Sequence, residues 1–99
     1  MKLQMHSIHF DADTKLLDFV QKKTSKLETF YDRIIDGEVF FKLDKDASKE
    51  NKIVEIKINI PGNQFFASEQ SSSFEEAADE AIQALRKQLM KYKTKINGR

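Results

Sequence analysis

The sequence predicts an α+β fold in which a four-stranded mixed sheet forms one layer and two helices pack on one of its faces. Four segments alternate apolar and polar side chains, as strands do when only one face of a sheet is buried. Two longer segments repeat apolar residues at helical spacing, and turn-forming residues separate the segments. In chain order the elements are β-α-β-β-β-α, which indicates a two-layer sandwich within a single domain over residues 1–99.

The first third of the chain predicts a strand and a long helix. Residues 2–8 alternate around Leu3 and Met5, which is typical of a strand. Residues 11–14 offer side chains that cap a helix, and this helix is expected to run to about Tyr31. The apolar stripe of the helix comprises Leu16, Val20, Leu27, Phe30, Tyr31 and Ile34.

Three further strands follow the first helix. Asp36-Gly37 is expected to end the helical stretch with a turn. Alternation then predicts strands at residues 38–44, 53–60 and 64–69, and Pro61-Gly62-Asn63 predicts a hairpin turn between the last two. The first and second strands are joined through a helix, so they can pair in parallel, whereas the other pairs are hairpins and therefore antiparallel.

A second helix is expected from about Phe74 to Lys95, with an N-cap from the serines at 71–73. Its apolar stripe comprises Ala78, Ala81, Ile82, Leu85, Leu89, Tyr92 and Ile96. The acidic residues at 75–80 lie where the helix dipole favours negative charge, so they are interpreted as helix N-terminal acids and not as a catalytic pair.

The composition excludes several classes of protein. The chain has no Cys, which excludes disulfides and Cys-based metal sites. It has neither an apolar run long enough for a membrane nor a signal-peptide pattern, so we expect a cytoplasmic protein. His6 and His9 fall on opposite faces of a strand, which disfavours a joint metal site. With no nucleophile motif and no phosphate loop, we expect no enzyme activity, metal, cofactor or small-molecule substrate.

The charge is distributed unevenly along the chain. Residues 1–82 contain 11 Lys or Arg and all 16 acidic residues, a net charge of −5, whereas residues 83–99 contain six bases and no acid. A basic C-terminal end of this kind favours an anionic partner such as nucleic acid. Bases at the end of a helix also complement its dipole, but the dipole does not require six of them.

The bases fall on specific sides of the two predicted helices. Lys15, Lys22, Lys26 and Arg33 line one edge of the first helix at 100° per residue, and Lys23 lies at the margin of its apolar stripe. On the second helix the bases fan around the side opposite the stripe; they are Arg86, Lys87, Lys91, Lys93 and Lys95. If both helices cover the same sheet face, these residues form one positive surface suited to RNA phosphates. The alternative is an ordinary solvated helix face.

Three blocks of sequence carry a resemblance to a known family. They are Lys26-Leu27-Glu28 with an aromatic pair and Asp32-Arg33 after it, Ile60-Pro61-Gly62 with Ala67 and Asp79 further on, and the basic run from Leu85 to Lys95. In this order, and over nearly the whole chain, they resemble the ribosome hibernation-promoting factor family, also called protein Y or ribosome-associated inhibitor.

The resemblance implies a fold similar to a double-stranded-RNA-binding domain with an added strand. It also implies a non-catalytic inhibitor that binds small-subunit rRNA in the channel for mRNA and tRNA, in starved or stationary cells. The positions that match basic positions of the family are Lys23, Lys26, Lys87, Lys91, Lys93 and Lys95, with Gln88 at a polar position. Lys22 and Arg86 are added as RNA contacts from the charge pattern.

The chain resembles the short members of the family, which in some bacteria need a separate partner protein to pair ribosomes. It departs from the family pattern at Ser7 and Ile8, and at Ala84, where Lys is common. Thr24 replaces a usual apolar residue, which is expected to soften the core at the first helix.

One alternative belongs to a different class of function. The exposed sheet face is expected to carry Phe40, Ile53 and Phe66. Such a face can serve a protein-interaction module, with the basic helices only solvated. Salt dependence separates the two hypotheses, because phosphate contacts weaken steeply with salt and apolar contacts do not.

Overall fold

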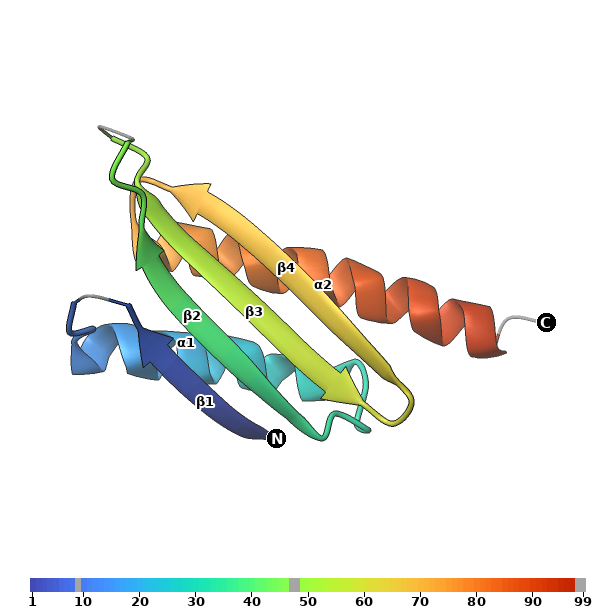
Figure 1. The fold of residues 1–99 in the computed structure, drawn as a ribbon. Coiled ribbons are helices and arrows are strands. Elements are labelled where there is room, and N and C mark those ends of the chain that lie inside the picture. The colour runs from blue at the N-terminus through green and yellow to red at the C-terminus, as the bar shows by residue number, and fades with distance from the viewer. Residues whose placement is uncertain (9, 47–48, 98–99) are drawn as a thin grey trace.

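The computed structural model describes residues 1–8, 10–46 and 49–97, and it has the predicted order of elements (Figure 1). The elements are β1 (Lys2–Ser7), α1 (Thr14–Ser25), the 3₁₀ turn η1 (Lys26–Thr29), β2 (Asp36–Leu43), β3 (Lys52–Ile60), β4 (Asn63–Ser71) and α2 (Phe74–Asn97).

The four strands form one mixed sheet in the order β1-β2-β3-β4. β1 pairs in parallel with β2, as the helical connection between them predicts, and the β2–β3 and β3–β4 pairs are antiparallel. Figure 1 shows α1 and α2 behind the same face of the sheet, with the C-terminal end of α2 extending past the sheet. The predicted α+β sandwich is confirmed, and it has one helical face and one open sheet face.

The core lies between the sheet and the two helices. The two central strands bury alternate residues, and the fully buried ones are Val39, Phe41, Val54, Ile56 and Ile58. The helices close the core with the buried side chains of Leu16, Val20, Ala77, Ala78, Ala81, Ile82, Leu85 and Leu89. The predicted stripe of the second helix is confirmed as far as the partly buried Tyr92, and the side chain of Ile96 lies outside the described residues. The stripe of the first helix is confirmed in part: Leu27, Tyr31 and Ile34 are buried but lie beyond the end of α1, and Phe30 is only half-buried.

The first helix is shorter than predicted. It ends at Ser25, and the 3₁₀ turn η1 replaces the expected continuation to Tyr31. The Thr29 hydroxyl donates to the Lys26 carbonyl at 2.7 Å, and the Phe30 N–H donates to Leu27 O, three residues back. A side chain that binds a carbonyl in this way competes with the helical ladder. The chain then leaves the helix while Tyr31 remains in the core.

Asp36 and Gly37 also differ from the prediction, because they belong to β2 and not to a turn. Gly37 is buried between β1 and β3, where an added Cβ would lie 2.9 Å from Ile58 Cδ1 and 3.1 Å from the Lys57 carbonyl oxygen. This glycine therefore permits close strand packing. The other predicted turn is confirmed, since Gly62 has a φ of 78° as a Pro-Gly type II turn requires.

Candidate nucleic-acid interface

The two helices that carry the predicted bases lie side by side on the sheet. They run in the same direction and contact each other (Figure 1). The predicted condition for one positive surface, that both helices cover the same face, is therefore met.

Lys23 bridges the two helices. Its ammonium lies 3.5 Å from Asp79 Oδ1 on α2 and 5.7 Å from the centroid of the Phe19 ring. The Lys23 side chain is 39% exposed, so its stem packs at the margin of the core while its charge emerges, as its wheel position predicts. Because Asp79 already compensates this charge, Lys23 offers less to an anion than a free lysine does.

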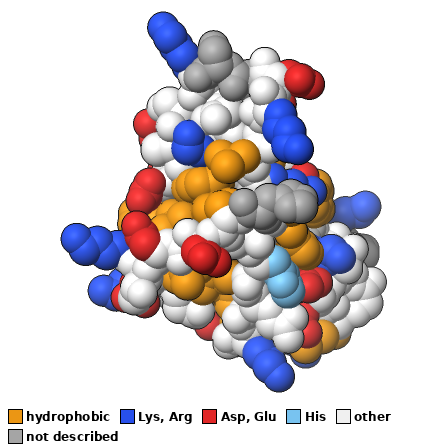
Figure 2. Space-filling model, turned by 60° about the vertical axis from the view of Figure 1, so that its left-hand side comes forward, with side chains coloured by type: hydrophobic (Ala, Val, Ile, Leu, Met, Phe, Trp, Pro, Cys, Tyr) orange, Lys and Arg blue, Asp and Glu red, His pale blue; other side chains and the backbone are white. Residues whose placement is uncertain are grey.

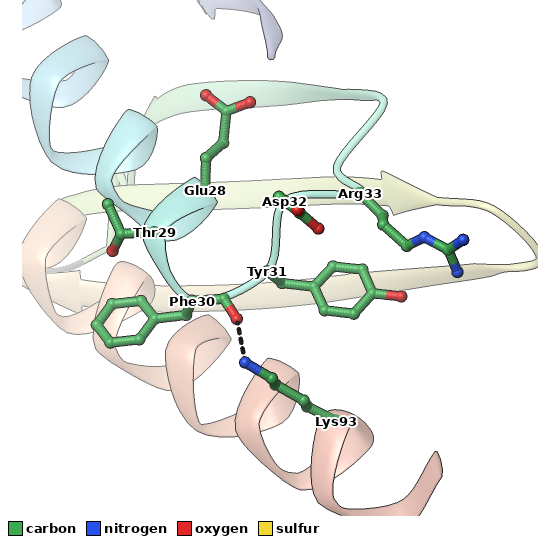
Figure 3. A pocket seen from close by; sticks show the side chains of 7 residues that line it. All are labelled: Glu28, Thr29, Phe30, Tyr31, Asp32, Arg33 and Lys93. Atoms are coloured by element: carbon green, nitrogen blue, oxygen red, sulfur yellow. Dashed lines mark hydrogen bonds between the residues drawn. The ribbon is translucent and has the colours of Figure 1, made fainter. Parts of the chain in front are cut away.

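Phe30 holds two of the bases of α2. The Arg86 guanidinium lies 4.4 Å from the centroid of the Phe30 ring, within the range of a cation–π contact. Lys93 Nζ donates to the Phe30 carbonyl oxygen at 3.3 Å, as Figure 3 shows. These contacts restrict two long side chains before any ligand arrives. The sequence pattern places Phe30 in the apolar stripe, and no local pattern signals this second role.

Five other predicted contacts extend into solvent. Lys22, Lys26, Lys87, Lys91 and Lys95 are all exposed. Within the described part of the chain, none of them forms an ion pair. Their charges are therefore available to an anionic partner.

Gln88 lies on the opposite flank of α2 from Arg86 and Lys93. Its Nε2 donates to the carbonyl oxygen of Phe66 in β4 at 3.0 Å. β4 is an edge strand, so this bond satisfies a backbone acceptor that the sheet leaves unpaired. The predicted polar position thus has a structural partner within the chain.

The predicted row of four bases on the first helix is wrong at one position. Lys15 and Lys22 lie on α1 and Lys26 begins η1, but Arg33 lies in the loop before β2. The spacing of 100° per residue holds only if the α-helix continues as far as Arg33, whereas α1 ends at Ser25 and η1 follows it. Arg33 instead lines a cavity together with Lys93.

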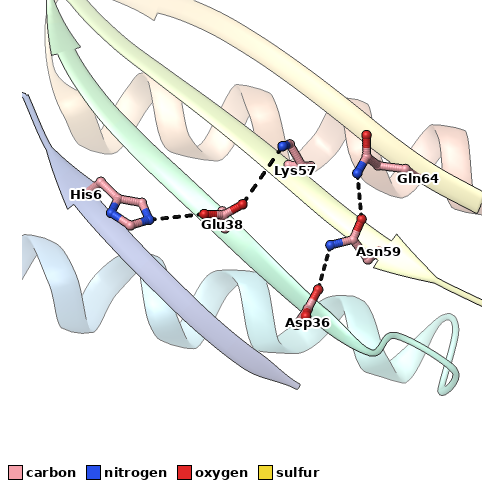
Figure 4. A network of polar contacts seen from close by, with 6 residues as sticks. All are labelled: His6, Asp36, Glu38, Lys57, Asn59 and Gln64. Atoms are coloured by element: carbon pink, nitrogen blue, oxygen red, sulfur yellow. Dashed lines mark hydrogen bonds and ion pairs between the residues drawn. The ribbon is translucent and has the colours of Figure 1, made fainter.

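The open sheet face is mostly polar, and Figure 4 shows how its side chains are linked. Glu38 lies 3.2 Å from His6 Nε2 and 3.9 Å from Lys57 Nζ, and Lys42 lies 2.8 Å from Glu55. A second chain of hydrogen bonds joins Asp36, Asn59 and Gln64. The charges on this face are therefore largely matched inside the molecule.

The apolar residues expected on the sheet face are only partly available. Phe40 is half-buried and stacks on the His6 ring at 4.9 Å, and Ile53 is also half-buried. Phe66 alone of the three is exposed, at 49%. This face offers an interaction module less apolar surface than the sequence suggests. Of the two histidines considered for a joint metal site, His6 lies on this face and His9 lies outside the described residues.

A small apolar surface lies at the end of the molecule where both helices begin. Figure 2 shows apolar side chains gathered there. Phe10 stacks on Phe74 with ring centroids 5.0 Å apart, and Ile8 and Leu43 are exposed by 37% and 42%. This surface lies away from the basic residues at the C-terminal half of α2.

Two kinds of site are not found in the described residues. No group of three or more His, Asp or Glu side chains there could hold a metal ion. Over residues 1–8, 10–46 and 49–97, no helix combines the length and the apolarity needed to cross a membrane.

The fold and its surfaces define a small α+β protein with a basic helical face. Its relatives specify the class further. A family model described as "Sigma 54 modulation protein / S30EA ribosomal protein" matches residues 3–97. The chain therefore belongs to this family, which places it among the non-catalytic ribosome hibernation factors and confirms the resemblance found in the sequence.

The relatives include proteins of about the same length as this chain and one about twice as long. The ribosome hibernation promoting factor of Klebsiella oxytoca is 30% identical, and the match covers 97% of both chains. That of Pseudomonas putida is 28% identical over 96% of this chain and 89% of its own length. The ribosome hibernation promotion factor of Deinococcus radiodurans is 28% identical over 93% of this chain, which spans only 49% of that relative.

Solved structures share the fold. A ribosomal subunit interface protein from Coxiella burnetii superimposes with a TM-score of 0.85 at 26% identity, over 95% of this chain and 99% of that one. The N-terminal domain of Thermus thermophilus Protein Y has a TM-score of 0.80 at 22% identity, over 93% and 99% of the two chains. The second comparison shows the fold alone.

Proposed function

We propose that residues 1–99 act as one ribosome-binding unit that inhibits translation by occupying the mRNA and tRNA channel of the small ribosomal subunit. The observation that carries this proposal is the contrast between the two faces of the molecule. The helical face carries exposed, unpaired lysines, whereas the charges of the sheet face are matched by neighbours. An RNA surface attracts the first kind of face and has little to gain from the second.

In this proposal the bases of both helices neutralise phosphates of rRNA. The contacting residues are Lys22, Lys23, Lys26, Arg86, Lys87, Gln88, Lys91, Lys93 and Lys95. The exposed lysines supply most of the charge, and the Phe30 contacts present Arg86 and Lys93 in fixed positions. Inhibition then requires shape and charge but no catalytic group, because a rigid body in the channel excludes mRNA and tRNA.

The test is co-sedimentation of the protein with purified small subunits over a series of salt concentrations. The variant Lys87→Glu/Lys91→Glu reverses two exposed bases of α2 and is expected to lose binding. The matched control, Lys45→Glu/Lys49→Glu, makes the same charge change in the exposed β2–β3 loop and is expected to keep it. Circular dichroism checks that both variants remain folded.

The wild-type protein should also lose affinity steeply with salt, by about 0.7–0.9 log units per log unit of salt for each phosphate contacted. A salt-independent affinity, or equal binding by the two double variants, would contradict the proposal. Salt-independent binding would instead support an apolar contact of the sheet face.

A further inference from the structure

A cavity of about 320 Å³ opens between the segment that follows η1 and the C-terminal part of α2 (Figure 3). Residues 28–33 form one side of it and Lys93 the other. It lies next to the bases of α2, because Lys93 lines the cavity and Phe30, which also lines it, contacts Arg86. No sequence motif indicates this cavity, since its two sides are 60 residues apart in the chain.

Two positive side chains, those of Arg33 and Lys93, line the cavity. Arg33 is exposed, and among the described residues it forms no ion pair. Lys93 donates to the Phe30 carbonyl, which leaves its remaining N–H groups free. Figure 3 also shows the Tyr31 side chain extending to the same side as Arg33. A guanidinium and an ammonium that line the same cavity are both donors that can bind phosphate oxygens.

The backbone that carries Arg33 is held on both sides. Tyr31 and Ile34 are only 8% and 7% exposed, so both neighbours of the Asp32-Arg33 pair are anchored in the core. The Tyr31 N–H donates to Leu27 O at 3.1 Å, and the Ile35 N–H donates to Asn59 O at 2.8 Å. The loop therefore needs little ordering when a ligand binds, which reduces the entropic cost of binding.

The acidic side chains at the cavity do not cancel its positive charge. Glu28 accepts a hydrogen bond from the α-ammonium group of Met1 at 2.8 Å, so its charge is compensated from outside the cavity. Asp32 is the remaining acid, against the two bases Arg33 and Lys93. The two bases outnumber the one uncompensated acid, so the charge at the cavity favours binding of an anion, although the Asp32 carboxylate repels it.

We propose that this cavity is a binding site for one backbone phosphate of the bound RNA. Arg33 binds the phosphate, and Lys93 is the second donor. The inference rests on the proposed function and extends its contact surface from the two helices to the loop before β2. The sequence places Arg33 in the positive edge of the first helix, whereas the structure places it in the loop before β2, beside Lys93.

The test compares Arg33→Gln with Lys45→Gln in salt titrations of small-subunit binding. Both variants lose one exposed charge from a loop, at opposite ends of β2, about 25 Å apart. Arg33→Gln is expected to weaken binding and to reduce the slope of log affinity against log salt by about 0.7–0.9. Lys45→Gln should leave the slope unchanged.

A second pair of variants removes a negative charge in place of a positive one. Asp32→Asn removes the acid that opposes the phosphate and should strengthen binding, whereas Asp46→Asn, in the remote loop, should not. If wild-type protein binds the subunit and all four variants keep its affinity and slope, the phosphate-binding site is wrong and the proposed function stands. If the wild-type protein itself does not bind, both proposals fail.

Discussion

At the scale of single residues, Thr24 is the least satisfied polar group of the core. Thr24 is 0% exposed, and its hydroxyl has no hydrogen-bond partner among the described residues. A buried hydroxyl without a partner destabilises the fold by its lost hydration.

We therefore predict that Thr24→Val raises the free energy of unfolding by about 1–2 kcal/mol, because Val has a similar shape without the unpaired hydroxyl. Urea denaturation measures the change. Thr29→Val is the control, because the Thr29 hydroxyl is exposed and donates to Lys26 O. That variant should be neutral or slightly less stable, and a destabilised Thr24→Val would show that the hydroxyl has a partner in solution.

At the scale of elements, the early end of α1 determines where the functional side chains lie. η1 brings the Phe30 ring beneath Arg86 and the Phe30 carbonyl to Lys93. A helix continued to Tyr31, as the sequence predicts, would have directed the ring and the carbonyl of Phe30 differently. Phe30 is therefore a positioning residue for two bases of α2.

We predict that Phe30→Leu weakens small-subunit binding about two- to fivefold, because it removes the aromatic face under Arg86 and keeps the carbonyl that binds Lys93. This corresponds to the ~0.5–1 kcal/mol of an exposed cation–π contact. A double-mutant cycle distinguishes positioning from general damage to the fold. Phe30→Leu should have almost no further effect on affinity in an Arg86→Gln background, and fully additive losses would contradict the positioning role.

At the scale of the whole molecule, the sandwich separates two surfaces of different character. The helices carry unpaired bases on one side, and the open side of the sheet carries linked charges with one exposed aromatic, Phe66. A two-layer fold forces this separation, because each layer buries one face and exposes the other.

The opposed faces predict that Phe66→Ser leaves small-subunit binding and its salt dependence unchanged. The substitution removes the exposed ring and retains the backbone carbonyl that Gln88 binds. Sedimentation in parallel with Lys87→Glu/Lys91→Glu provides the comparison. Loss of binding in Phe66→Ser would favour the sheet face as the contact surface.

The sequence by itself determined the order of elements and most of the two apolar stripes, and it allowed the parallel pairing of β1 with β2. These features follow from the periodicity of apolar residues within each strand or helix and from the lengths of the connections between them. It also identified which residues are basic, and hence the candidate interface. The affinity of that interface for RNA stays a prediction.

Only the tertiary structure decided where those bases lie and what each one touches. Lys23 meets Asp79, Arg86 meets Phe30, and Arg33 shares a cavity with Lys93, although each pair is more than 50 residues apart. The end of α1 and the place of Gly37 within β2 depend likewise on packing against other elements. The physical reason is that periodicity reports which face of an element is buried, whereas long-range packing sets where the element ends and which side chains it meets.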